Sequence, residues 1–182
     1  MTFNKPSGFT LIELMIAIAI FAILMAVGIP GLQNLRSNTN VDSFSQLLMR
    51  GLSRAREEGS SQINNFAIIC GSDDGLSCTD NTWDDGWIIF IGADPIAQDP
   101  DVQLPAQDDI LWVENTSTFE VLVANGAPDW VGFNGFNASI PALANTFTIC
   151  GPNRDESSGK LISISNSGSL SRQSGLIADA CN

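Results

Sequence analysis

The feature that most constrains this chain is a long apolar run near its N-terminus that starts directly after one carboxylate. No charged residue lies between Glu13 and Arg36. As an α-helix, about 22 residues span about 33 Å, which matches the roughly 30 Å hydrocarbon core of a bilayer. The run therefore predicts a membrane-spanning helix.

The carboxylate in front of the run separates three interpretations. A secretory signal needs a small-x-small cleavage site after its apolar run, but here Pro30 follows Val27-Gly28-Ile29 and disfavours cleavage. A plain membrane anchor explains the run and leaves Glu13 unexplained, because a carboxylate near the membrane is unfavourable without a partner. A third interpretation supplies that partner from a neighbouring subunit.

The residues Gly8-Phe9-Thr10-Leu11-Ile12-Glu13 resemble the leader and N-terminus of type IV prepilins and pseudopilins. The resemblance implies that a prepilin peptidase cleaves after Gly8 and that the new terminus, Phe9, is N-methylated. It also implies a filament contact in which Glu13 of one subunit pairs with the Phe9 amine of the next. Each charge then offsets the desolvation of the other and sets the axial register.

The helix is expected to continue past the membrane, from about Phe9 to Glu58. Proline removes one backbone hydrogen bond and clashes with the preceding turn, so we expect a kink or a locally melted stretch at Pro30; alternatively, the membrane helix simply ends there. Farther along, an apolar stripe at helical spacing predicts a face that packs on a sheet. Its members are Phe44, Leu48, Leu52 and Ala55, and Gly59 with Ser60 and Ser61 is the expected helix stop.

After Gly59, short β-rich runs alternate with turn clusters. Strands are expected at 63–70, 87–91, 110–114, 118–124, 146–150, 161–165 and 168–172, with a possible short one at 130–133. Loops are expected at 71–85, 92–109, 134–145 and 151–159. One long helix followed only by strands predicts an α+β pilin fold, with an antiparallel sheet packed on the helix.

The expected organisation has four parts: a cleaved leader 1–8, a transmembrane and filament-core helix 9–35, an amphipathic helix 36–59, and a periplasmic β-rich head 60–182. The chain is expected in the inner membrane, with one span and a periplasmic head. After assembly it is expected in a cell-surface pilus.

Several head motifs resemble the GspH/FimT/FimU group of minor pilins and pseudopilins. They are Ala55-Arg56-Glu57-Glu58, Asp85-Gly86-Trp87-Ile88-Ile89-Phe90, Phe133-Asn134-Gly135, and the segments 146–150 and 161–165 followed by Gly168. The group implies a minor pilin that joins and primes type IV pili used in twitching and adhesion. The alternative is a GspH-type pseudopilin of a type II secretion system. Implied partners are other minor pilins, the major pilin, the prepilin peptidase and the inner-membrane assembly platform.

The charge pattern argues against a nucleic-acid partner. Some FimT-type members carry a basic G-R-x-R element in the last hairpin for DNA uptake, whereas Gly168-Ser169-Leu170-Ser171-Arg172 keeps one arginine. The net charge is −12, and the segment from Asp73 to Glu120 has no Lys or Arg, so its field repels a phosphate backbone. We therefore expect the four tryptophans, Trp83, Trp87, Trp112 and Trp130, to be core or sheet residues.

Four cysteines with no histidine and no CxxC pair speak against a zinc or thioredoxin-like site. In an exported domain an even number favours disulfides. Of three possible pairings, we favour Cys70–Cys78, which closes a turn-forming cluster, and Cys150–Cys181, which ties the C-terminus to a strand. The resemblance adds that such bonds are more usual in minor pilins than in secretion pseudopilins.

No catalytic constellation is expected. Without histidine, no serine has the usual base, and the adjacent pairs Asp84/Asp85 and Asp108/Asp109 point to opposite faces of a strand. We expect no enzyme activity and no cofactor. The acidic loop 94–109 carries oxygen ligands that suit Ca²⁺ but lacks EF-hand spacing, so calcium is left open and no metal ligands are assigned.

Overall fold

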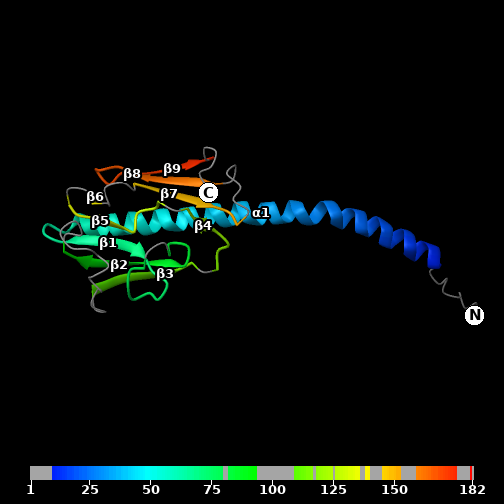
Figure 1. The fold of residues 1–182 in the computed structure, drawn as a ribbon, viewed down its shortest axis with the longest axis horizontal. Coiled ribbons are helices and arrows are strands. Elements are labelled where there is room, and N and C mark those ends of the chain that lie inside the picture. The colour runs from blue at the N-terminus through cyan, green and yellow to red at the C-terminus, as the bar shows by residue number, and fades with distance from the viewer. Residues whose placement is uncertain are drawn as a thin grey trace, which may run out of the picture. The chain divides into compact units, whose positions relative to one another are not determined.

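The computed structural model describes residues 10–79, 82–93, 109–116, 118–124, 126–135, 138–139, 145–152, 159–175 and 181, with the backbone alone for 27–34 and 138–139. In this part of the chain, helix α1 (Leu11–Ser60) is followed by strands β1 to β9 (Figure 1). The chain divides into two compact units, Met1–Arg36 and Ser37–Asn182.

Helix α1 is continuous over its whole length. The backbone stays helical through Pro30, so the locally melted stretch is absent from the described backbone; a kink there stays a prediction. Helix α1 ends at Ser60, within the predicted stop Gly59-Ser60-Ser61. Gly59 also lies close to another strand: a Cβ at this position would overlap the backbone carbonyl of Phe133.

The strands form two antiparallel sheets, where the sequence predicted one. The first sheet has the order β3-β2-β1-β5-β6 and the second has the order β4-β7-β8-β9. The first contains β1 (Phe66–Gly71), β2 (Gly86–Gly92), β3 (Ile110–Asn115), β5 (Trp130–Phe133) and β6 (Ala138–Ser139). The second contains β4 (Leu122–Val123), β7 (Thr146–Cys150), β8 (Lys160–Ile164) and β9 (Leu170–Ser174). The α+β class is confirmed.

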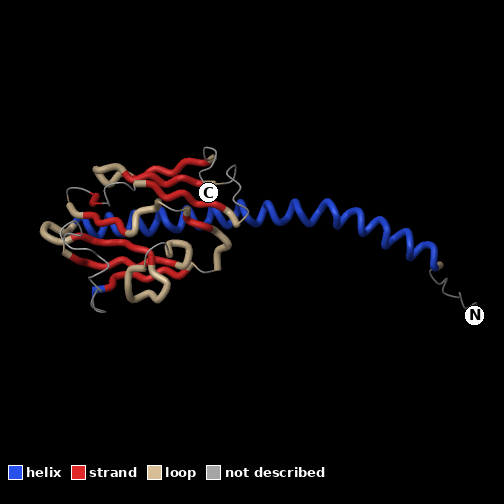
Figure 2. Tube along the Cα trace, in the orientation of Figure 1, coloured by secondary structure: helices blue, strands red, loops and turns tan. Residues whose placement is uncertain are grey.

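Both sheets share one apolar core with the second part of α1. Figure 2 shows strands on both sides of this part of the helix. The predicted stripe of Phe44, Leu48, Leu52 and Ala55 is fully buried in this core. Strands of the first sheet contribute Ile69, Trp87, Ile89, Val131 and Phe133, and strands of the second contribute Phe147, Ile149, Ile162 and Ile164. A helix with a sheet on each side explains why its apolar stripe is wide.

A second apolar cluster covers the opposite face of the first sheet. Successive side chains of a strand point to opposite faces, so Ile69 contacts the helix side while Ile68 and Cys70 join Ile88 and Phe90 on the other side. Burial on both faces explains why β1 and β2 are continuous apolar runs with no alternation.

Two strand predictions need correction, and a third is confirmed. The stretch 134–145, expected as a loop, contains β6. Of the expected strand 118–124, only Leu122–Val123 is a strand, because a turn in which the Phe119 amide donates to the Thr116 carbonyl at 2.8 Å occupies its start. The possible strand at 130–133 is β5, which pairs with both β1 and β6.

Candidate functional site

The start of α1 is closed by a reciprocal capping box. The Thr10 amide and hydroxyl each donate to Glu13 Oε2 at 2.9 Å, and the Glu13 amide donates to Thr10 Oγ1 at 3.3 Å. The T-x-x-E spacing of Thr10 and Glu13 is the sequence signal of this capping box. Glu13 Oε1 makes no hydrogen bond within the described residues, so it remains open to a second subunit.

The first turns of α1 expose their apolar side chains. Every large hydrophobic residue from Leu11 to Met25 is between 43% and 77% exposed. An apolar surface of this extent marks an interaction site. Among the residues whose side chains are described, no helical stretch is both long and apolar enough to qualify as a membrane span.

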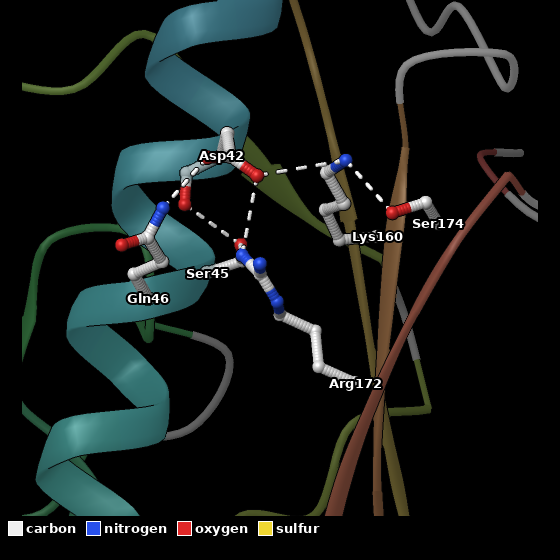
Figure 3. Close-up of polar contacts among 6 residues, drawn as sticks. All are labelled: Asp42, Ser45, Gln46, Lys160, Arg172 and Ser174. Atoms are coloured by element: carbon white, nitrogen blue, oxygen red, sulfur yellow. Dashed lines mark hydrogen bonds and ion pairs between the residues drawn. The ribbon is translucent and has the colours of Figure 1, made fainter.

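One flank of α1 is joined to the second sheet by a polar cluster that we call the Asp42 clamp: Asp42, Ser45, Gln46, Lys160 and Arg172 (Figure 3). Arg172 Nη1 lies 3.2 Å from Asp42 Oδ1 and donates to Ser45 Oγ at 2.9 Å. Lys160 Nζ lies 3.6 Å from the same carboxylate oxygen. One helical carboxylate therefore holds cations from β8 and β9.

The clamp keeps Asp42 ionised. Partial burial opposes its charge, but the hydrogen bond from Gln46 and the charges of Arg172 and Lys160 outweigh that effect and hold the pKa of Asp42 below its usual value. Arg172, the one arginine of the stretch that corresponds to the G-R-x-R element, thus contacts helix α1 of the same chain.

The other flank of α1 forms a groove against the first sheet, which we call the Arg54 groove. Its volume is about 480 Å³. Its lining includes Leu47, Arg50, Gly51 and Arg54 of α1, Trp87 of β2, and Trp112 of β3. The Arg54 guanidinium lies 4.3 Å from the centre of the Trp112 ring, which is a cation–π contact.

Three of the four indoles differ in their hydrogen bonds. Trp83 Nε1 donates to the Pro128 carbonyl at 2.8 Å, and Trp112 Nε1 donates to Glu114 at 3.2 Å. Trp87 Nε1 is buried and has no acceptor within the described part of the chain. As expected, Trp83, Trp87 and Trp130 are buried, whereas Trp112 is a sheet residue that is 41% exposed.

The end of α1 meets two motifs that lie far apart in the sequence. A smaller cleft of about 160 Å³ is lined by Arg56, Phe133, Asn134, Gly135 and Gly168, among others. Gly168 has φ of +74°, and a side chain at this position would approach the Phe133 ring. Three of the motifs that carried the family resemblance, those with Arg56, Phe133 and Gly168, thus converge on one place, where they shape the fold.

Both favoured disulfides are present, Cys70–Cys78 and Cys150–Cys181. The loop closed by the first is organised by Asp74, whose Oδ1 accepts from the amides of Leu76 and Ser77 at 2.7 and 2.8 Å. These backbone hydrogen bonds, helped by the Ser77 hydroxyl, lower the pKa of Asp74 to about 2.

Several predicted residues fall outside what the structure describes. They are Gly8, Phe9, the side chain of Pro30 and the acidic segment 94–108. The Phe9–Glu13 pairing and the calcium question therefore stay predictions. Among the described residues, no group of three or more Cys, Asp or Glu is arranged to hold a metal ion.

A pilin-type N-terminus ahead of one long helix, with two antiparallel sheets on that helix, defines a type IV pilin-like subunit. Residues 3–29 match the model of the prokaryotic N-terminal methylation motif. Residues 45–168 match the model of the type II transport protein GspH, and the chain belongs to this family. Members of the family are structural subunits rather than enzymes. No curated protein and no solved structure matched the chain.

Proposed function

We propose that this chain is a minor pilin that is incorporated into type IV pili and primes their assembly. It is made as an inner-membrane precursor with a periplasmic head, loses residues 1–8, and enters the filament through α1. Other minor pilins and the major pilin are its neighbours, and the assembly platform extracts it from the membrane. No nucleic-acid partner is proposed.

The observation that carries this proposal is the uncovered apolar surface of α1 from Leu11 to Met25, headed by the single carboxylate of Glu13. A bilayer covers such a surface before assembly, and the helices of neighbouring subunits cover it afterwards. The Phe9 amine of the next subunit is the proposed partner of Glu13, because a carboxylate that leaves water needs an opposite charge.

The sharpest test separates the charge of Glu13 from its capping role. Glu13→Gln keeps an acceptor for Thr10, since glutamine also forms capping boxes, but it removes the charge. We expect leader cleavage to remain and the amount in sheared filaments to fall at least about tenfold, as for a broken buried ion pair. Immunoblots of sheared filaments and of membranes measure both quantities.

Thr10→Ala is the matched control, since it removes the cap and leaves the carboxylate. It costs the helix about 1 kcal/mol, and we expect near wild-type incorporation. If Glu13→Gln is incorporated normally while Thr10→Ala is not, Glu13 acts as a cap and the intersubunit pair is wrong.

The second candidate function is a pseudopilin of a type II secretion system, which the match to the GspH model favours. The two disulfides favour the pilus. A clean deletion, scored for surface pili by electron microscopy and for secreted exoenzymes in the same culture, separates the two. Loss of pili with normal secretion supports the minor pilin, and the converse supports the pseudopilin.

A further inference from the structure

The Arg54 groove is not filled by any described residue of its own chain. We propose that it binds an acidic segment of a neighbouring filament subunit. A carboxylate of that segment contacts Arg50 and Arg54, and an oxygen acceptor reaches Trp87 Nε1. This inference rests on the proposed function, because it places the partner in the same filament.

Charge is the first reason. Arg50 and Arg54 are exposed and make no ion pair within the described residues, although the chain has a net charge of −12. Glu57 and Glu114 also line the groove, but neither forms an ion pair with a described arginine. A guanidinium with free donors binds carboxylates in a bidentate geometry.

The position of Arg54 is fixed before a partner arrives. Its guanidinium is held 4.3 Å from the centre of the Trp112 ring. A side chain that is already ordered loses less conformational entropy on binding than a free one. The stacking leaves the N–H groups of Arg54 without hydrogen-bond acceptors in the described part of the chain.

The buried indole of Trp87 is the second, independent reason. Trp87 is 1% exposed, and its Nε1 donor has no acceptor among the described residues. Gly51 packs directly against it: a Cβ on this residue would be 2.7 Å from Trp87 Nε1. A buried donor without a partner is unfavourable. Because Nε1 is not accessible to solvent, the acceptor of the bound segment reaches it only when the indole shifts toward the groove.

The surroundings favour a protein segment over a small anion. Strand β3 is the edge of the first sheet, and its Trp112, which lines the groove, is 41% exposed. Trp and Arg are the side chains that contribute most to protein interfaces. An extended acidic segment covers both the two arginines and the exposed Trp112 ring, whereas a small anion leaves the ring uncovered.

The test is photocrosslinking in cells, with the full chain in assembled filaments. A benzophenone amino acid replaces Ser53, an exposed residue in the lining of the groove, and replaces Ser171 of β9 as the position control. The crosslinked peptide is identified by mass spectrometry. Arg50→Glu combined with Arg54→Glu tests the charges, and Arg56→Glu, on the same helix outside the groove, is the charge control.

We expect the Ser53 crosslink to map to an Asp- or Glu-containing segment of another filament subunit. Arg50→Glu combined with Arg54→Glu should reduce the yield of the Ser53 crosslink at least about tenfold, and Arg56→Glu should leave the yield unchanged. A lysine in place of the partner's acidic residue should restore the crosslink to the double variant. A crosslink to lipid, to a segment without carboxylates, or one insensitive to the double reversal overturns the inference. So does the absence of a Ser53 crosslink in filaments that contain the chain. Absence of the chain from sheared filaments overturns the proposed function, and this inference with it.

Discussion

The two flanks of helix α1 handle charge in opposite ways. At the Asp42 clamp, one carboxylate of the helix holds Lys160 and Arg172 of the second sheet. At the Arg54 groove, Arg50 and Arg54 face the first sheet and form no ion pair with a described carboxylate. The first flank is closed within the subunit, and the second is open. The open flank is therefore the one that suits a partner.

Helix geometry explains how one helix serves both flanks. Asp42, Gln46, Arg50 and Arg54 are spaced four residues apart and form one ridge. Because an i+4 ridge is inclined to the helix axis, it begins beside the second sheet and ends beside the first. Its acidic end meets the cations of β8 and β9, and its basic end meets the aromatic edge of the first sheet.

The largest expected effect is on the free energy of unfolding when the disulfide of either sheet is removed. Replacing Cys150 and Cys181 by alanine should lower the free energy of unfolding by about 3.5 kcal/mol, and replacing Cys70 and Cys78 should lower it by about 2.5 kcal/mol. The longer loop loses more chain entropy when it is closed. Denaturant unfolding of the two variants measures the difference, and a larger loss for Cys70/Cys78 would contradict this ranking.

The next effect concerns the depth of the groove. Gly51→Ala places a methyl group against the buried Trp87 indole, which costs about 1–3 kcal/mol through overpacking and regains up to about 1 kcal/mol of helix propensity. We expect a net loss of stability and a shifted tryptophan fluorescence spectrum. Gly59→Ala should destabilise more, because it meets the backbone of Phe133 rather than a side chain. Equal melting temperatures for the two variants would argue against this difference.

A smaller effect is expected at the Asp42 clamp. Asp42→Asn leaves Lys160 and Arg172 without their carboxylate and should cost about 1 kcal/mol, since the carboxylate is partly exposed. Glu57→Gln, an exposed helical carboxylate outside the clamp, should change stability by less than about 0.5 kcal/mol. Thermal unfolding at low and high salt measures both, and the Asp42 effect should shrink in 1 M NaCl. A loss that salt does not change would exclude an electrostatic clamp.

The smallest effect is a pH dependence in the loop of the first disulfide. Asp74 has a folded-state pKa of about 2, against 3.8 for a free aspartate. Its lowered pKa contributes stability that is fully present above about pH 3.8 and is lost as the pH falls toward 2. The stability difference between wild type and Asp74→Asn should therefore shrink across that range. A difference that stays constant from pH 5 to pH 2 would mean that the carboxylate charge plays no part.

Features carried by neighbouring residues were predictable. The stripe of Phe44, Leu48, Leu52 and Ala55 predicted the buried helix face, and the turn-forming clusters separated most strands. The division into two sheets was not predictable, because the alternation of strands and turns does not indicate which strands pair with one another. For the same reason the sequence did not indicate that Gly59, part of the helix stop, also lies against the backbone of Phe133.

The sequence by itself determined the long helix, the pilin-type N-terminus, the α+β class and the burial of the helical stripe, because each depends on residues a few positions apart. Only the tertiary structure decided that Asp42 meets Arg172, 130 residues away, and that Gly51 lies opposite Trp87. Such contacts depend on strand register and on how the sheets pack against the helix. Local periodicity predicts neither the strand register nor the packing of the sheets, so the difference between the two flanks of α1 is visible only in the folded chain.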